Sequence, residues 1–264
     1  MSKGKCKLCL LDGMDLQESH FLSAGIYRLL RGDGEANPNP WVIMEKAAFQ
    51  TSKQQKAPLL CSDCEQRLSR NGENWALRNC LKADRSFPLA ATLASQSPDL
   101  SSAQTTTKVY YASGISAIDV DALSYFAASI FWRGSIYPWN RDGSYPVNLG
   151  PFQEPFRTYL MGLAPFPKDS SLWVIVREGG QIDRMTYAPL GKREGKVHVY
   201  KFPMPGLGFS LTVSKNVPTN YRNLCFVHGN GNPIIATTIL EDMLMRDAVR
   251  LGEKSLRKCA SMLI

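Results

Sequence analysis

Apolar residues in the middle of the chain recur with the period of an α-helix. Between residues 118 and 132 they fall three or four positions apart, and Asp119 and Asp121 stand near the start, where negative charge suits the helix dipole. We therefore predict a mostly buried amphipathic helix over this range. A second helix is predicted to begin at Gly150 and Pro151, because proline is tolerated in the first helical turn.

The pattern becomes that of β-strands from residue 172 onward. Short runs rich in β-branched and aromatic residues are separated by glycine, proline and asparagine. The predicted strands cover residues 172–176, 185–189, 196–202, 209–213 and 223–227, and a closing helix is predicted over residues 238–258. This order predicts an α+β fold in which helices are followed by an antiparallel sheet.

The local amino-acid composition divides the chain into two segments. The first 64 residues hold four of the seven cysteines, whereas residues 89–107 are rich in serine, threonine, alanine and glutamine, as is typical of a linker or a long surface loop. We expect a small zinc-binding module over residues 1–88 and a larger α+β domain over residues 108–264.

Composition favours a globular protein and limits its expected location in the cell. The chain has 264 residues, of which 44% are hydrophobic and 20% charged, an ordinary globular balance. No stretch approaches the roughly 18 uninterrupted apolar residues that cross a bilayer, and no apolar run of a signal peptide follows the N-terminus. We expect a cytoplasmic protein without a membrane partner, in which cysteines stay reduced.

The net charge of +8 favours polyanions as partners. Nucleic acid is the commonest polyanion in a cell, and we expect DNA before RNA. The excess is spread along the chain, with one local cluster at Lys192, Arg193, Lys196 and Lys201, and it is equally compatible with a plain solvated surface. Charge alone leaves both interpretations open.

Two Cys-x-x-Cys pairs carry the strongest chemical signal. Cys6 and Cys9 form the first pair, and Cys61 and Cys64 form the second. A two-residue spacer lets both thiolates of a pair face one ion from a tight turn, and two pairs complete the tetrahedron of a structural zinc site. Since a helical pattern begins after Cys64, the order of knuckle, hairpin and helix predicts a treble clef.

Between the cysteine pairs stands the dipeptide Ser19-His20, and a glutamate, Glu65, follows the second pair directly. Together these motifs resemble the zinc-bearing branch of the HNH nuclease superfamily. The resemblance covers residues 1–80 at the level of motifs. It implies that His20 is the general base that activates water, beside a divalent cation such as Mg²⁺ or Mn²⁺ that stabilises the developing charge.

The sequence departs from that superfamily in two places. No histidine follows the second cysteine pair until His198, so the second metal-binding histidine is missing, and Glu65 stands where an asparagine is usual. A carboxylate can hold Mg²⁺ or Mn²⁺, so Glu65 with Glu18 or Glu73 is a candidate replacement. The alternatives are a structural or zinc-binding role for His20 and a helix-dipole role for Glu65.

Four arginines near these motifs are candidate phosphate contacts. Arg28 and Arg31 follow His20 on a predicted helix, and Arg67 and Arg70 follow Cys64. The alternative is that they form solvated helix faces.

We therefore carry two functional hypotheses forward. In the first, the chain is a metal-dependent HNH-like endonuclease that acts on nucleic acid. In the second, the zinc module is a catalytically inactive scaffold that binds nucleic acid, a protein partner or a second copy of the chain, as in a bacterial or phage defence or regulatory system.

Overall fold

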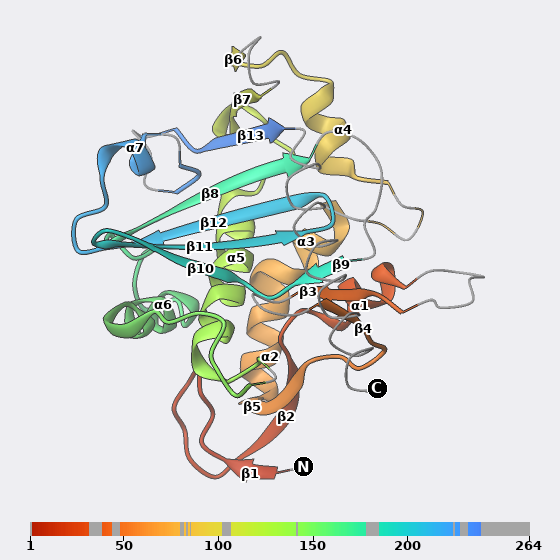
Figure 1. Cartoon of the computed structure of the whole chain (residues 1–264), viewed down its shortest axis with the longest axis vertical. Helices are drawn as coiled ribbons and strands as arrows, with labels where there is room; N and C mark the ends of the chain where they lie inside the picture. The colour runs from red at the N-terminus through yellow and green to blue at the C-terminus, as the bar shows by residue number, and fades with distance from the viewer. Residues whose placement is uncertain are drawn as a thin grey trace, which may run out of the picture.

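The computed structural model describes residues 2–31, 39–43, 48–79, 82, 84, 86–101, 107–140, 142–177, 185–223, 225–227 and 232–238. These residues form a mixed α+β fold, as the sequence predicted, with three β-sheets around a long central helix (Figure 1). The closing helix predicted over residues 238–258 lies almost wholly outside the described residues, and so does His228.

A small sheet at the N-terminal end has the strand order β1-β2-β5, and its members are β1 (Ser2–Gly4), β2 (Met14–His20) and β5 (Lys56–Cys61). Both of its pairings are antiparallel, and Leu16 of β2 lies opposite Cys61 of β5. A nearly continuous helical stretch follows β5 and comprises α2 (Ser62–Leu68), the π-helical turn η1 (Ser69–Glu73) and α3 (Asn74–Asn79). Helix α1 (Ala24–Leu30) follows β2. The order of cysteine knuckle, antiparallel strand pair and helix is the one expected of a treble clef.

The large sheet has the order β10-β11-β12-β8-β13-β7-β6. Its members are β6 (Leu100–Ser101), β7 (Lys108–Tyr111), β8 (Ser170–Arg177), β10 (Leu190–Glu194), β11 (Val197–Met204), β12 (Leu207–Val213) and β13 (Ile234–Thr238). All of its pairings are antiparallel except that of β13 with β8, which is parallel. The sheet is therefore mixed, because β13 enters next to β8 from a later part of the chain.

The predicted strands near residues 172, 185, 196 and 209 correspond to β8, β9 (Met185–Tyr187), β11 and β12. The strand predicted over residues 223–227 is wrong: α7 (Thr219–Arg222) ends directly before this region, and Val227 makes only an isolated bridge to Leu172. Its apolar residues instead fill the core, since Cys225 and Phe226 are fully buried. An apolar run thus marks burial here rather than strand pairing.

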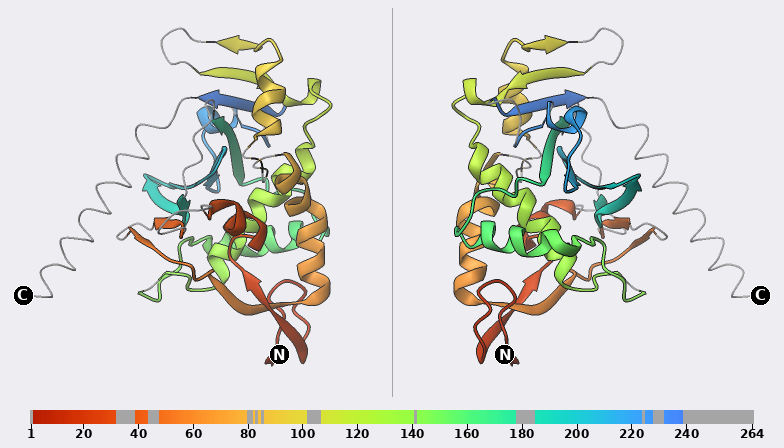
Figure 2. Two further views of the ribbon diagram at one scale, coloured as in Figure 1. Left: turned by 90° about the vertical axis from the view of Figure 1, so that its right-hand side faces the viewer. Right: turned by 90° about the vertical axis from the view of Figure 1, so that its left-hand side faces the viewer.

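Helix α5 (Val120–Ile136) runs through the centre of the molecule. Asp119 caps its N-terminus by accepting a hydrogen bond from the Ala122 amide at 2.9 Å. The helix is buried around most of its circumference, with the large sheet on one side and the α2–α3 stretch on the other (Figure 2). Phe126, for example, packs edge-to-face on Phe209 of β12 at 6.0 Å between ring centroids.

One hydrophobic core includes residues from both predicted segments, from Cys6 near the N-terminus to Ile235 in β13. The stretch predicted as a linker begins with helix α4 (Pro88–Ala94), whose Leu89 and Leu93 are buried in that core. Residues 41–43 of β3 (Trp41–Ile43) also pair with β9 in a third sheet, completed by β4 (Ala48–Gln50). The two segments therefore share packing, and their division into independently folding units stays a prediction.

The remaining helix, α6 (Gln153–Leu160), follows a single 3-10 turn at Gly150–Phe152, near the predicted start of the second helix. No helix among the described residues is long and apolar enough to span a membrane.

The two segments approach each other closely at Gly72, where α5 crosses the helical stretch. A Cβ atom on Gly72 would lie 2.7 Å from the backbone nitrogen of Phe126. Backbone on both sides leaves no flexible side chain to give way. We expect Gly72→Ala to lower the free energy of unfolding by about 1–3 kcal/mol, as overpacking does. Denaturant titration measures the change.

The matched control for this substitution is Gly114→Ala. A Cβ on Gly114 would meet no atom within 4 Å. This variant is expected to stay within about 0.5 kcal/mol of the parent. Equal stability of the two variants would contradict the tight crossing at Gly72.

Candidate metal centre and the charges around it

The four predicted cysteines come together from three separate elements. Cys6 and Cys9 lie in the turn after β1, Cys61 ends β5, and Cys64 lies in the first turn of α2. All four sulfur atoms lie within 4.8 Å of one another, and the Sγ atoms of Cys9 and Cys61 are 3.9 Å apart. Three of these cysteines are buried and Cys9 is partly buried. The cluster can hold one metal ion.

Backbone hydrogen bonds shape the first knuckle. The amide of Cys6 donates to the Leu11 carbonyl at 3.0 Å, and the amide of Leu10 donates back to the Cys6 carbonyl at 2.9 Å. Closing so tight a turn puts Leu10 in the left-handed region, with a φ of 65°, which a leucine rarely adopts. The amide of Cys61 donates to Sγ of Cys6 at 3.4 Å, which ties the knuckle to the second pair.

The protonation of the cluster is uneven. A hydrogen bond from the Cys64 thiol lowers the pKa of Cys6 to about 4, and the same contact raises the pKa of Cys64. Burial raises the pKa of Cys9. Cys6 therefore loses its proton more readily than Cys9 or Cys64. A bound cation would replace the thiol protons, since metal ligation requires deprotonated cysteine.

We expect the purified protein to carry one tightly bound metal ion per chain, and Cys64→Ser to lose most of it. Loss of a sulfur ligand opens the site, so the variant is also expected to unfold at a lower temperature. Elemental analysis by mass spectrometry and a thermal melt measure the two effects.

Cys225→Ser is the control for this experiment. Its thiol is buried elsewhere in the core, 3.0 Å from the Arg222 carbonyl and 2.5 Å from the Val227 carbonyl, and can donate to either of them. A serine hydroxyl can also donate to one of these carbonyls, so metal content should match that of the parent. Metal-free parent protein, or full metal content in Cys64→Ser, would contradict the site.

His20 lies at the far end of β2 from the cysteine cluster. It pairs with Lys56, whereas Leu16, four residues earlier, pairs with Cys61. At the rise of a β-strand this separation is about 13 Å. The His20 side chain is partly buried. The structure therefore places the candidate base on the predicted hairpin but away from the cluster.

The backbone of His20 is held by a buried guanidinium. Nη1 of Arg133, in α5, donates to the carbonyl oxygens of His20 at 2.7 Å and Phe21 at 3.3 Å. Nη2 of the same side chain makes a short ion pair with the carboxylate of Glu73 at the end of η1. Arg133 is 2% exposed. Burial by itself lowers the pKa of Arg133, but Glu73 and Glu65 outweigh it and raise that pKa, so the group stays charged.

The three candidate carboxylates therefore have different surroundings. Glu73 is bound to Arg133, and Glu18 makes an exposed ion pair with Lys56 at 3.5 Å. Glu65 is partly buried in the field of Arg133, and its Oε1 atom has no hydrogen-bond partner among the described residues. Within the described ranges, the four cysteines form the one cluster of three or more histidine, cysteine or acidic residues close enough to share a metal ion.

The four candidate phosphate-binding arginines also differ. Arg28, Arg31 and Arg70 are exposed. Arg67 instead donates from Nη1 to the Met161 carbonyl just beyond α6, at 3.2 Å, and so helps to hold α2 against that helix. The sequence pattern treated Arg67 and Arg70 alike, and only the packing of α6 separates them.

Two arginines that join distant segments, Arg133 and Arg157, were not predicted to have a role. The signal for Arg133 was its position in an otherwise apolar helical run, where a charge has to find a buried partner. Arg157 in α6 donates to the Leu8 carbonyl in the cysteine knuckle at 2.6 Å and pairs with Glu154. No local pattern connects residue 157 with residue 8.

Comparison with known proteins identifies no relative: no protein-family model, no curated protein and no solved structure matches this chain.

Proposed function

We propose that the cysteine cluster holds zinc and that the chain is a zinc-stabilised protein that binds nucleic acid, DNA before RNA, without cleaving it. The absence of cleavage is inferred from one observation, the ion pair of Arg133 with Glu73 beside the backbone of His20. The endonuclease hypothesis stays a prediction, and a plasmid-nicking assay distinguishes it from this proposal.

Zinc suits the cysteine cluster in both chemistry and size. Four thiolates are a common ligand set for structural zinc, with Zn–S bonds of about 2.3 Å. In a regular tetrahedron such bonds separate the sulfurs by about 3.8 Å, close to the 3.9 Å between Cys9 and Cys61. Four protein ligands leave no position for water, so a zinc ion here would stabilise the module rather than activate a nucleophile.

The charges around His20 favour binding over hydrolysis. A metal-dependent nuclease needs a cation beside its base, with carboxylates free to hold that cation. Here Arg133 brings a permanent positive charge next to Glu73 and Glu65. A second, divalent cation at these carboxylates would be repelled by the guanidinium and would have to displace Glu73 from it.

Exposed arginines within residues 1–88 support the nucleic-acid part of the proposal. Arg28 and Arg31 both project from the region of α1, close in sequence to His20. Neither side chain has a hydrogen bond or an ion pair with another described residue, so both guanidinium groups are available to phosphates. The net charge of +8 adds a general attraction to a polyanion.

We expect the double charge reversal Arg28→Glu, Arg31→Glu to weaken binding of a short DNA duplex by at least about tenfold at low salt. If both arginines contact phosphates, the slope of log K against log salt should also fall by about 2. Fluorescence anisotropy across a salt series measures both effects.

The control for charge is Lys192→Glu, Lys196→Glu, which removes the same net charge from the exposed β10–β11 hairpin. Its effect should be several-fold smaller. An equal loss in both double variants would mean that overall charge, and not the α1 surface, drives binding. An RNA duplex of the same sequence, bound as tightly as the DNA, would remove the stated preference.

The second test is a plasmid-nicking assay of the parent protein with Mg²⁺ and with Mn²⁺. Because Arg133 occupies the neighbourhood of the carboxylates, we expect no nicking above the background of the His20→Ala variant. Metal-dependent nicking that His20→Ala abolishes would instead support the endonuclease and overturn the non-cleaving proposal.

A further inference from the structure

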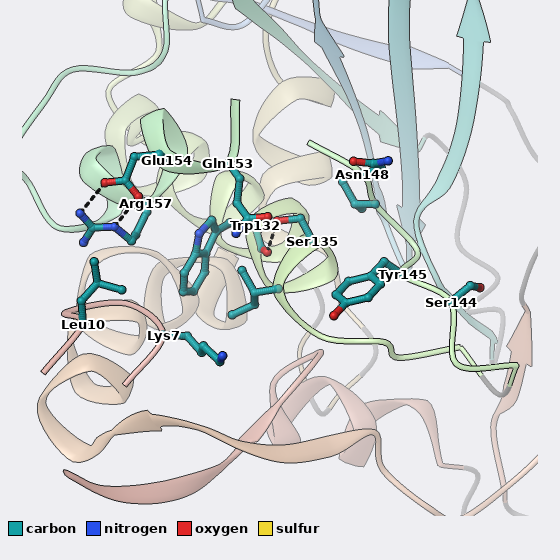
Figure 3. Close-up of a pocket in the computed structure, with 12 residues that line it drawn as sticks. Lys7, Leu10, Trp132, Ser135, Ser144, Tyr145, Asn148, Gln153, Glu154 and Arg157 are labelled. Carbon is teal, nitrogen blue, oxygen red and sulfur yellow. Dashed lines mark hydrogen bonds and ion pairs between the residues drawn. The ribbon is translucent and has the colours of Figure 1, made fainter. Parts of the chain in front are cut away.

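A cavity of about 660 Å³ lies where the cysteine knuckle meets α5 and α6. Its walls are Lys7 and Leu10 of the knuckle, Trp132 near the end of α5, Tyr145 in the following loop, and Gln153 and Arg157 of α6 (Figure 3). This volume falls in the range of small-molecule sites in proteins, roughly 300–1,000 Å³.

Specific bonds fix the walls of this cavity. Arg157 joins α6 to the knuckle through the Leu8 carbonyl at 2.6 Å, and the Glu154 carboxylate holds its guanidinium at 2.6 and 2.8 Å. On the other side, the Tyr200 hydroxyl donates to the Asn148 carbonyl at 2.5 Å and anchors the loop that carries Tyr145. The cavity is therefore preformed rather than a gap between loosely placed segments.

Trp132 supplies a hydrogen-bond donor that nothing in the described structure uses. Its side chain is fully buried, and its indole Nε1 has no partner among the described residues. Two other tryptophans donate to carbonyls at 2.7 and 2.8 Å, Trp139 to Arg133 and Trp173 to Tyr221. An unpaired buried donor is unfavourable, and an acceptor atom in the cavity would satisfy it.

The charges and apolar surfaces of the lining indicate what such an acceptor belongs to. Arg157 and Glu154 neutralise each other, which leaves the exposed ammonium of Lys7 as the uncompensated charge of the described lining. Leu10 and Tyr145 also border the cavity, and they are large hydrophobic residues with 42% and 52% of their surface exposed. A fitting ligand has an anionic group, a further acceptor and a flat apolar face.

We propose that this cavity binds a nucleoside monophosphate, with its phosphate at Lys7, an acceptor atom at the Trp132 indole and its base against Tyr145 and Leu10. The same chemistry has two sources, a free mononucleotide and the phosphorylated end of a strand. The proposal does not depend on the α1 arginines, so either can fail without the other.

Calorimetric titration of the full-length, metal-loaded protein in phosphate-free buffer tests this site. The probes are AMP, GMP, CMP and UMP, with adenosine and ribose 5-phosphate as fragments that lack the phosphate or the base. At least one monophosphate should bind with one-to-one stoichiometry, and both fragments should bind at least about tenfold more weakly. Absence of saturable binding of all four monophosphates overturns the proposal.

Point variants place the binding in this cavity. Trp132→Phe keeps a ring but removes the N–H, and Lys7→Gln removes the charge from an exposed position that folding does not need; each should weaken binding about five- to tenfold, the worth of one hydrogen bond or charge contact. Lys5→Gln, also exposed in the knuckle but outside the cavity, should bind like the parent. Metal content is measured for every variant, so that a damaged knuckle is recognised.

Two outcomes concern where the ligand sits and where it comes from. A neighbouring hollow of about 390 Å³, beyond the Tyr145 loop, is lined by Lys192 and Arg193. If Lys192→Gln, Arg193→Gln abolishes binding while Lys7→Gln and Trp132→Phe do not, the proposed site is wrong. Competition by an oligonucleotide with a 5′-phosphate, but not by its unphosphorylated form, would support the site and identify a strand end as the source.

Discussion

The buried guanidinium of Arg133 is the interaction on which the arrangement of this protein depends. Arg133 extends from α5 into the protein interior, where its charge has lost its contact with water. The free-energy cost of this desolvation is offset only by ionic and hydrogen-bond partners. The nearest of those partners are Glu73 and the carbonyls of His20 and Phe21, all from the N-terminal segment, and the Ser129 hydroxyl of α5 accepts a longer bond of 3.4 Å. Removing one partner of such a buried pair typically costs about 3–5 kcal/mol. Arg133 therefore holds the strand end and the helix of the N-terminal segment against the central helix.

The same interaction bears on chemistry. The Glu73 carboxylate is paired with a cation that belongs to the protein, so its charge is balanced without a metal ion. The cysteine cluster, about 13 Å along the strand, is a separate site with its own ligands. This separation, with a guanidinium beside the carboxylates that a second cation would need, is the reason why we propose a binding role rather than a hydrolytic one.

Arg157 has a related role on the opposite side of the cysteine knuckle. It connects α6 to the Leu8 carbonyl, and the cavity with the unpaired Trp132 indole lies beside this connection. A conformational change in the knuckle would therefore alter the cavity directly, because Arg157 both binds the Leu8 carbonyl and lines the cavity. The cysteine cluster, Arg157 and the cavity form one connected region between the N-terminal segment and the helices that follow it.

The sequence by itself determined those features that depend on the spacing of residues close together in the chain. The two-residue spacers brought the cysteines of each pair together, the helical period placed α5, and apolar alternation located β8, β11 and β12. It did not reveal β10, because that strand lies at the sheet edge with exposed charged residues such as Lys192 and Arg193, and it misplaced a strand at residues 223–227. Only the tertiary structure decided that Arg67 binds the Met161 carbonyl while Arg70 stays exposed, and that Arg133 meets Glu73. Spacing is a property of neighbouring residues, whereas the partner of a buried charge or an unpaired donor is set by segments that meet only after the chain has folded.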